Sequence, residues 1–228
     1  MNRVGNVVRM QLVNRQTFIW IPLIILAGSL VVSIVIWSMI PYDAPKYGGG
    51  AQAPLWYFFA VGIMGMTQTF PFSQAMSVTR REFFLGSLLT AGLTSAILTA
   101  IFVIGGFVEQ ATTGWGVNGY FFYLDWIWSS GPAVAAVLIL FMTMTFFVTG
   151  FAIATIYKRF GPAVLTVILV GLGLLLVGAM WLIGRLNAWG QVFGWIVTQG
   201  PEGLAVGLLI TLVALSGIAY GLLRRTIP

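Results

Sequence analysis

The sequence predicts an all-α integral membrane protein. Of its 228 residues, 59% are hydrophobic and only 7% are charged, and the mean hydropathy is +0.99. Soluble domains carry roughly 25% charged residues, so a water-soluble fold of this composition could not cover its own surface. The apolar residues also fall into six runs, each long enough to cross a bilayer as a helix, for which roughly 20 residues are needed.

The six runs are the predicted transmembrane helices. The first contains Pro22 in its first turn, where a missing N–H costs little, and the second contains Pro71, which we expect to kink it. A helix is expected in each run because a backbone in lipid must satisfy its own hydrogen bonds. The predicted spans are about 17–40, 55–76, 84–107, 132–156, 161–183 and 203–223.

Residues 1–16, ahead of the first span, are predicted to form an interfacial helix. Val4, Val7, Val8 and Leu12 fall in one helical sector, although Gln11 and Arg15 interrupt it. An apolar sector beside arginines is typical of a helix lying in the plane of the membrane interface.

The positions of the basic residues predict the orientation. With a cytoplasmic N-terminus, nine of the 11 Lys and Arg residues are inside, and only Lys46 and Arg185 are outside. The positive-inside rule favours this arrangement, which places both termini in the cytoplasm. We expect one membrane domain over 1–228, with no attached soluble domain. The nine inside residues are Arg3, Arg9, Arg15, Arg80, Arg81, Lys158, Arg159, Arg224 and Arg225.

Three outer segments connect the spans. Residues 41–54 are rich in Pro and Gly and predict a flexible turn. Residues 108–131 hold seven aromatic side chains between Trp115 and Trp128, which predicts a segment resting at the lipid headgroups. Residues 184–202 are too polar to span the membrane and too apolar to form a loop in water. A short re-entrant or surface helix is therefore expected there.

Most enzyme classes are excluded by the residues that are missing. The chain has no Cys and no His, which removes the commonest nucleophile–base pairs and metal ligands. A P-loop needs a Lys after Gly-rich backbone, and Lys46 and Lys158 follow Pro45 and Tyr157. The cations sit singly or in pairs at the edges of apolar runs, which argues against nucleic acid. We therefore expect no enzyme, no metal site and no cofactor bound by this chain.

Polar residues within the spans are mostly hydroxyls and amides. They could line a translocation path, or they could hydrogen-bond within or between helices. No charged relay lies at mid-membrane, which disfavours ion-coupled transport and leaves hydrophobic or amphipathic substrates. The candidate path residues are Thr67, Gln68, Gln74, Thr90, Thr94, Thr145 and Thr149.

Small residues mark sites where helices could approach closely. Gly203 and Gly207, and again Gly217 and Gly221, are four apart in the last predicted span. This spacing favours close helix packing, although 28 glycines make chance matches frequent.

The turn between the second and third spans is the segment around which the chain is organised. Ser77 and Thr79 can cap a short amphipathic helix, with Glu82 in its first turn, where a carboxylate is favoured. Arg80 and Arg81 could dock a soluble partner, or they could only set the topology.

The chain resembles type 2 ABC exporter permeases. The resemblance rests on the N-terminal interfacial helix, the six spans with both ends inside, and the phrase Val78-Thr-Arg-Arg-Glu-Phe-Phe-Leu-Gly-Ser-Leu88. The polar segment before the final span is similar to the re-entrant helices of this family. The aromatic segment 108–131 departs from the pattern.

The resemblance implies a function and partners. Residues 3–16 would be the elbow helix, and 77–88 would be the coupling helix that docks on a separate ATP-binding subunit carrying ATP and Mg. A second permease chain, identical or not, would enclose the path, in the plasma membrane of a bacterium. Within the coupling helix, arginines would pair with acidic groups of the ATPase and two rings would fill its groove. These coupling residues are Arg80, Arg81, Glu82, Phe83 and Phe84.

Two alternatives stay open. One is a non-transporting scaffold or immunity protein that sequesters a toxic peptide or lipid, and the other is a passive channel for small neutral solutes. The substrate of an exporter could be a drug, a lipid or a peptide, since a cleft with scattered hydroxyls fits all three.

Overall fold

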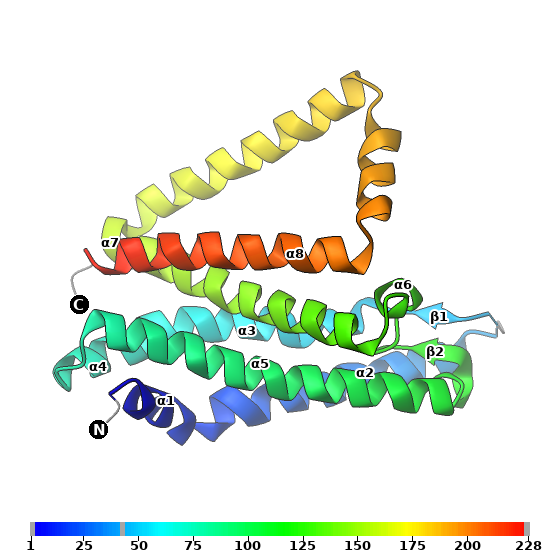
Figure 1. The fold of residues 1–228 in the computed structure, drawn as a ribbon, viewed down its shortest axis with the longest axis horizontal. Coiled ribbons are helices and arrows are strands. Elements are labelled where there is room, and N and C mark those ends of the chain that lie inside the picture. The colour runs from blue at the N-terminus through cyan, green and yellow to red at the C-terminus, as the bar shows by residue number, and fades with distance from the viewer. Residues whose placement is uncertain (1–2, 42–43, 226–228) are drawn as a thin grey trace.

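The computed structural model describes residues 3–41 and 44–225, and they form an all-helical bundle with a small cap at one end (Figure 1). The principal helices are α1 (Arg3–Val13), α2 (Ile21–Met39), α3 (Ala53–Met64), α4 (Phe70–Ala75), α5 (Arg80–Ala111), α6 (Asp125–Trp128), α7 (Pro132–Arg185) and α8 (Trp189–Leu223). Two short π-helical segments, η1 (Gln16–Trp20) and η3 (Gly65–Thr69), lead into α2 and α4.

Four helices of the described chain are long and apolar enough to cross a membrane: Gln16–Met39, Arg80–Ala111, Pro132–Arg185 and Trp189–Leu223. The predicted all-α class is therefore confirmed, and these four helices fit a multi-pass membrane protein. The second predicted span is the segmented rod of α3, η3 and α4. The fourth and fifth both fall within α7, so the count of six spans and the orientation stay predictions.

Two glycines divide the longest helices. Gly161 in α7 has φ 81° and Gly200 in α8 has φ 60°, and a proline follows each of them. Positive φ is accessible to glycine at little cost, and proline cannot continue the preceding hydrogen bonds. Figure 1 shows the result: residues 162–185 diverge from the bundle, a short helix turns back, and the rest of α8 returns along the bundle. The short helix, over 189–199, lies where a re-entrant or surface helix was expected.

The π-helical segments η1 and η3 each stand directly before a proline in the next helix. The C-cap N–H of η1, from Ile21, bonds the carbonyl of Gln16, five residues back, just ahead of Pro22. Pro22 has no N–H, and the Tyr57 hydroxyl of α3 donates to the carbonyl of Thr17 at 3.0 Å instead. In lipid, such substitute donors make a break in a helix tolerable. Pro71 follows η3 in the same way, so the predicted kink takes the form of a π-bulge.

Helix α1 packs against α5 through the predicted apolar sector. Val7 is buried, and Val4, Val8 and Leu12 are partly buried. Gln11, which interrupts the sector, is buried as well and donates from Nε2 to Ser87 Oγ at 2.9 Å. The sector therefore faces the bundle.

An outer cap joins the connecting segments at one end of the bundle. Strands β1 (Lys46–Tyr47) and β2 (Gly119–Tyr120) pair in parallel, with Lys46 opposite Gly119. Lys46 Nζ donates at 2.9 Å to the carbonyls of Trp37 and Ile40, the last carbonyls of α2. A cation there also complements the helix dipole. Within 41–54, the part that the structure describes is tied to α2 and β2 by these contacts, and its flexibility stays a prediction.

The aromatic segment of the cap is folded inward. Phe121, Phe122 and Trp128 are buried, and Phe122 packs edge-on against Phe102 of α5 at 5.1 Å between ring centroids. The prediction of a segment resting at the headgroups is therefore wrong for these rings, which pack on their own chain.

Glu109, in the last turns of α5, organises this inward fold. Its carboxylate is fully buried, and it accepts hydrogen bonds from Trp115 Nε1 at 2.7 Å and from the backbone N–H of Phe121 at 2.9 Å. The backbone N–H groups of Phe122 and Tyr123 donate to the second oxygen at 2.8 Å each. Several N–H donors on one carboxylate can together stabilise its negative charge.

The Tyr47 hydroxyl links the two halves of the cap by donating to Asp125 at 2.7 Å. This hydrogen bond, together with partial burial and the charge of Asp125, raises the pKa of Tyr47 to about 12 from 10.0. A raised pKa means that the contribution of this contact to stability is complete below about pH 10 and disappears as pH rises to about 12.

The titration of Tyr47 can be isolated by subtracting the phenolate absorbance of Tyr47→Phe from that of the wild type. We expect this difference to have its midpoint near pH 12 rather than pH 10. Asp125→Asn should bring this transition back toward pH 10, because it removes the charged acceptor. A difference midpoint near pH 10 in the wild-type background would contradict the contact.

Candidate functional site

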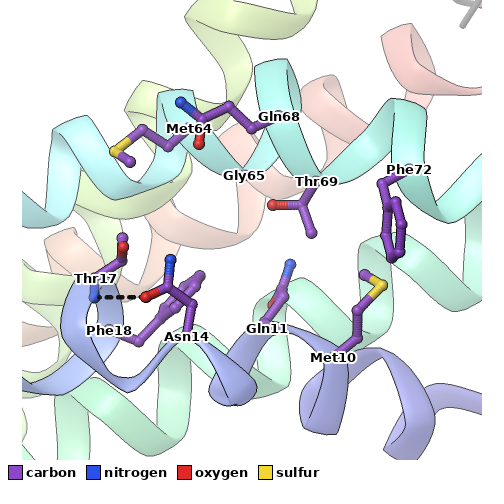
Figure 2. Close-up of a pocket in the computed structure, with 10 residues that line it drawn as sticks. All are labelled: Met10, Gln11, Asn14, Thr17, Phe18, Met64, Gly65, Gln68, Thr69 and Phe72. Carbon is purple, nitrogen blue, oxygen red and sulfur yellow. Dashed lines mark hydrogen bonds between the residues drawn. The ribbon is translucent and has the colours of Figure 1, made fainter.

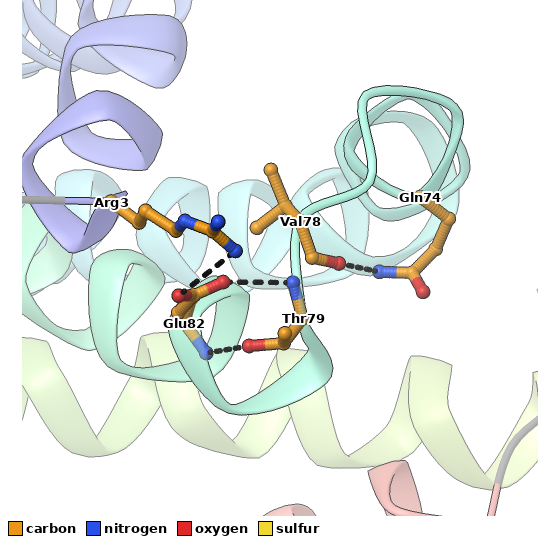
Figure 3. Close-up of polar contacts among 5 residues, drawn as sticks. All are labelled: Arg3, Gln74, Val78, Thr79 and Glu82. Atoms are coloured by element: carbon orange, nitrogen blue, oxygen red, sulfur yellow. Dashed lines mark hydrogen bonds and ion pairs between the residues drawn. The ribbon is translucent and has the colours of Figure 1, made fainter.

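The predicted coupling segment forms a tight turn (Figure 3), and Figure 1 shows this turn at the end of the bundle opposite the cap. Ser77 has φ 57°, and Val78 N–H returns to the carbonyl of Ser73 at 3.1 Å. Gln74 Nε2 donates to the carbonyl of Val78 at 3.0 Å, which ties the turn to α4. The role of Gln74 is thus to fix this turn.

A capping box starts α5 at Thr79. The N–H of Glu82 donates to Thr79 Oγ1 at 3.3 Å, and the N–H of Thr79 donates to Glu82 Oε2 at 2.9 Å. Each partner satisfies a backbone donor that the helix leaves free. The predicted cap at Thr79, with Glu82 in the first turn, is confirmed, whereas Ser77 makes no cap. The prediction of a separate short helix is wrong, since these residues are the first turn of the 32-residue α5.

Ionic and polar contacts connect the turn to both ends of the described chain. Arg3 Nη1 of α1 lies 3.8 Å from Glu82 Oε1, and Arg80 Nη1 donates to the carbonyl of Arg224 at 2.6 Å. The Arg3 side chain is 66% exposed, so this ion pair orients α1 more than it stabilises it. Arg81 is exposed and projects from the same turn.

Phe83 and Phe84 lie in the core rather than on the surface. Phe83 packs on Phe70 of α4 at 5.2 Å, and Phe84 packs on Phe151 of α7 at 5.8 Å and on Tyr220 of α8 at 5.2 Å between ring centroids. Because the two rings are 0% and 7% exposed, neither can fill a groove on a partner in this conformation. They connect the turn rigidly to three other helices.

Cations gather at this end of the molecule. Figure 1 shows the N-terminal helix, the α4–α5 turn, the break in α7 and the C-terminal end of α8 at the same end, with the cap at the other. Arg159, Arg224 and Arg225 line an open cavity of about 480 Å³ there. Lys46, in β1 of the cap, lies toward the opposite end. The residues predicted to share one side of the membrane thus share one end of the bundle.

The hydroxyls of the predicted path residues are used within their own helices. Every one of the five threonines donates to a carbonyl one turn back, at 2.7 to 3.0 Å. This geometry is the intrahelical alternative named for them above, and it leaves no hydroxyl proton free for a ligand. The five are Thr67, Thr90, Thr94, Thr145 and Thr149.

Gln68, the remaining path residue, lines a pocket of about 220 Å³ between the N-terminal segment and the α3–α4 rod (Figure 2). Asn14 and Thr17 face it from one wall, and Gln68 and Thr69 from the other. Gln11 lies on the same wall as Asn14. Sequence reasoning missed this pocket, because Gln11 reads as a flaw in an amphipathic pattern. The available signal in the sequence was an amide residue, Gln11, within an otherwise apolar helical sector.

No group of three or more acidic side chains that could hold a metal ion occurs in residues 3–41 and 44–225. No family model, no curated protein and no solved structure matches this chain.

Proposed function

We propose that this chain is the membrane-spanning permease subunit of an ATP-driven ABC exporter in a bacterial plasma membrane. In this proposal it has six spans, both termini are cytoplasmic, and the substrate is hydrophobic or amphipathic. ATP and Mg are bound by a separate subunit, and a second permease chain completes the path, which opens alternately to the two sides.

The observation that carries the proposal is the construction of the α4–α5 turn. A surface turn that transmits force must be stiff and must be joined to the helices that move. The capping box stiffens this turn, and Phe83 and Phe84 join it to α4, α7 and α8. Arg81 is left exposed beside it, as a charge available to an acidic partner surface.

The divergent half of α7 supports the second permease chain. Leu174, Leu175 and Leu176 are each 67–71% exposed, and this half is apolar all round. Gly171 and Gly178, seven residues apart, lie on one side of this half, and added Cβ atoms there would meet nothing within 4 Å, so this side can receive another helix closely.

The docking role of the turn can be tested by charge reversal at Arg81. We expect Arg81→Glu to reduce copurification with the proposed ATP-binding subunit, sought by coexpressing this chain with its neighbouring genes, by at least tenfold, because like charges would then face each other. Membrane insertion and melting temperature should stay unchanged, since Arg81 is exposed. Phe84→Ala is unsuitable, because it would open the core.

Arg185→Glu is the matched control, since Arg185 ends the far side of α7, away from the turn. It should keep wild-type copurification. Equal ATPase recovery with Arg81→Glu and Arg185→Glu would contradict docking at this turn. A wild-type chain that binds no ATPase, even with nucleotide present, would favour the scaffold instead.

A further inference from the structure

The pocket between the N-terminal segment and the α3–α4 rod has the composition of a binding site for an uncharged molecule. None of its lining side chains is charged, although Arg9 and Arg15 flank it in sequence. Amide and hydroxyl groups line it beside the apolar side chains of Met10, Met64 and Phe72. A few polar groups in an apolar lining are typical of small-molecule sites, since they orient a ligand that apolar contact retains.

Gln11 supplies a polar group that the protein leaves incompletely bonded. Its side chain is 2% exposed, Nε2 donates to Ser87 Oγ, and Oε1 accepts no hydrogen bond from the residues that the structure describes. An amide nitrogen has two N–H groups, so a second donor is available as well. Figure 2 shows the Gln11 nitrogen pointing toward the pocket, facing Thr69. A buried amide left in this state is costly, which favours an occupant that bonds to it.

The backbone around the pocket is irregular on both walls. Thr17 and Phe18 come from the π-helix η1, and Gly65, Gln68 and Thr69 come from the π-helix η3. Isolated π-helical turns are uncommon and occur frequently at functional sites. Here two π-helical turns from separate segments face one pocket. The proline after each turn explains the irregular backbone, but it does not explain why both turns lie at the same pocket.

We propose that this pocket binds an uncharged amphiphile through a hydroxyl or amide group. The polar group bonds the Gln11 amide, and the apolar part lies against Met10, Met64 and Phe72. A hydroxyl or an amide fits because it both donates and accepts, as the Gln11 amide does. The ligand is either a neutral lipid of the bilayer or a solute that enters from water, and both share this chemistry.

Photolabelling of the full chain in nanodiscs tests the proposal. The probe is a monoacylglycerol with a diazirine in its acyl chain, and labelled sites are mapped by mass spectrometry. We expect labels at Met10, Met64 or Phe72. Gln11→Leu should reduce them at least tenfold, because it removes the amide at similar size.

Two further variants separate binding from folding. Thr69→Phe should fill the pocket and reduce labelling while leaving the Gln11–Ser87 hydrogen bond in place. Gln110→Leu is the matched control, since Gln110 is exposed at the far end of α5 and should keep full labelling. Melting temperatures show that the variants are folded.

Competition then identifies the source of the ligand. Loss of label with unlabelled monoacylglycerol in the bilayer indicates a lipid, and stronger competition by water-soluble hexanamide indicates a solute. Labelling that is equal in all variants would overturn the proposal. The proposal would also be overturned if no label were found and Gln11→Leu had a higher melting temperature than wild type. That result is expected of a pocket that holds only water. None of these measurements requires the ATPase or transport.

Discussion

Replacing Gly150 with alanine is expected to destabilise the bundle by roughly 3 kcal/mol, the upper end of the range for overpacked cores. Gly150 of α7 and Gly62 of α3 lie at the crossing of these two helices. A Cβ on Gly150 would lie 2.0 Å from the carbonyl oxygen of Phe59, and one on Gly62 would lie 2.1 Å from that of Phe147. Backbone atoms cannot rotate away as a side chain can, so the helices must separate.

The size of this effect can be measured against a glycine in the same helix. At Gly171 of α7 an added Cβ would meet nothing within 4 Å, so Gly171→Ala should leave stability unchanged or raise it by up to about 1 kcal/mol through helix propensity. The measurement is thermal unfolding of the purified variants in detergent, followed by tryptophan fluorescence. Equal melting temperatures for Gly150→Ala and Gly171→Ala would show that α3 and α7 do not touch at this crossing.

The second large effect is expected at Glu109, where a glutamine should release the outer cap. Four N–H groups converge on the carboxylate, and the glutamine amide would turn its own N–H₂ toward two of them. Breaking a buried charged network costs roughly 3–5 kcal/mol. For a chain of this length, such a loss corresponds to a fall in melting temperature of roughly 10 °C.

Limited proteolysis localises this change. Chymotrypsin should cut Glu109→Gln within residues 115–128, where wild type resists because three of the seven rings are buried and three more are partly buried. Glu202→Gln is the matched control, since Glu202 is an exposed acid in α8. Identical cleavage and melting of the two variants would mean that the cap does not depend on the Glu109 carboxylate.

Glu109 also shows a limit of reading sequence. As a carboxylate near the end of an apolar run, it is predicted to be one more acid of an outer loop. Its donors come from residues 6 to 14 positions later, and they converge only after the chain reverses through 113–118, where five residues have positive φ. Backbone donors carry no residue signature, so no pattern of side chains could reveal them.

The glycines show the same limit in packing. The paired spacings at Gly203, Gly207, Gly217 and Gly221 suggest close contacts, yet an added Cβ would meet nothing within 4 Å at the last three of them. The positions where backbones touch, Gly62 and Gly150, lie in no such motif. Which glycine meets a neighbour depends on where two helices cross, and that is set by the packing of the whole bundle.

The sequence by itself determined the features that arise within one helix or from bulk composition. Apolar length fixed the all-helical membrane class, the charge pattern fixed which residues share an end, and Thr79 with Glu82 fixed the start of α5. Only the tertiary structure decided the burial of Phe83 and Phe84, the fold of the cap around Glu109, and the pocket at Gln11. The physical reason is range: capping acts over three residues, whereas burial depends on separate segments that meet only in the folded chain, 6 to 14 positions apart at Glu109 and 76 apart for Gln11 and Ser87.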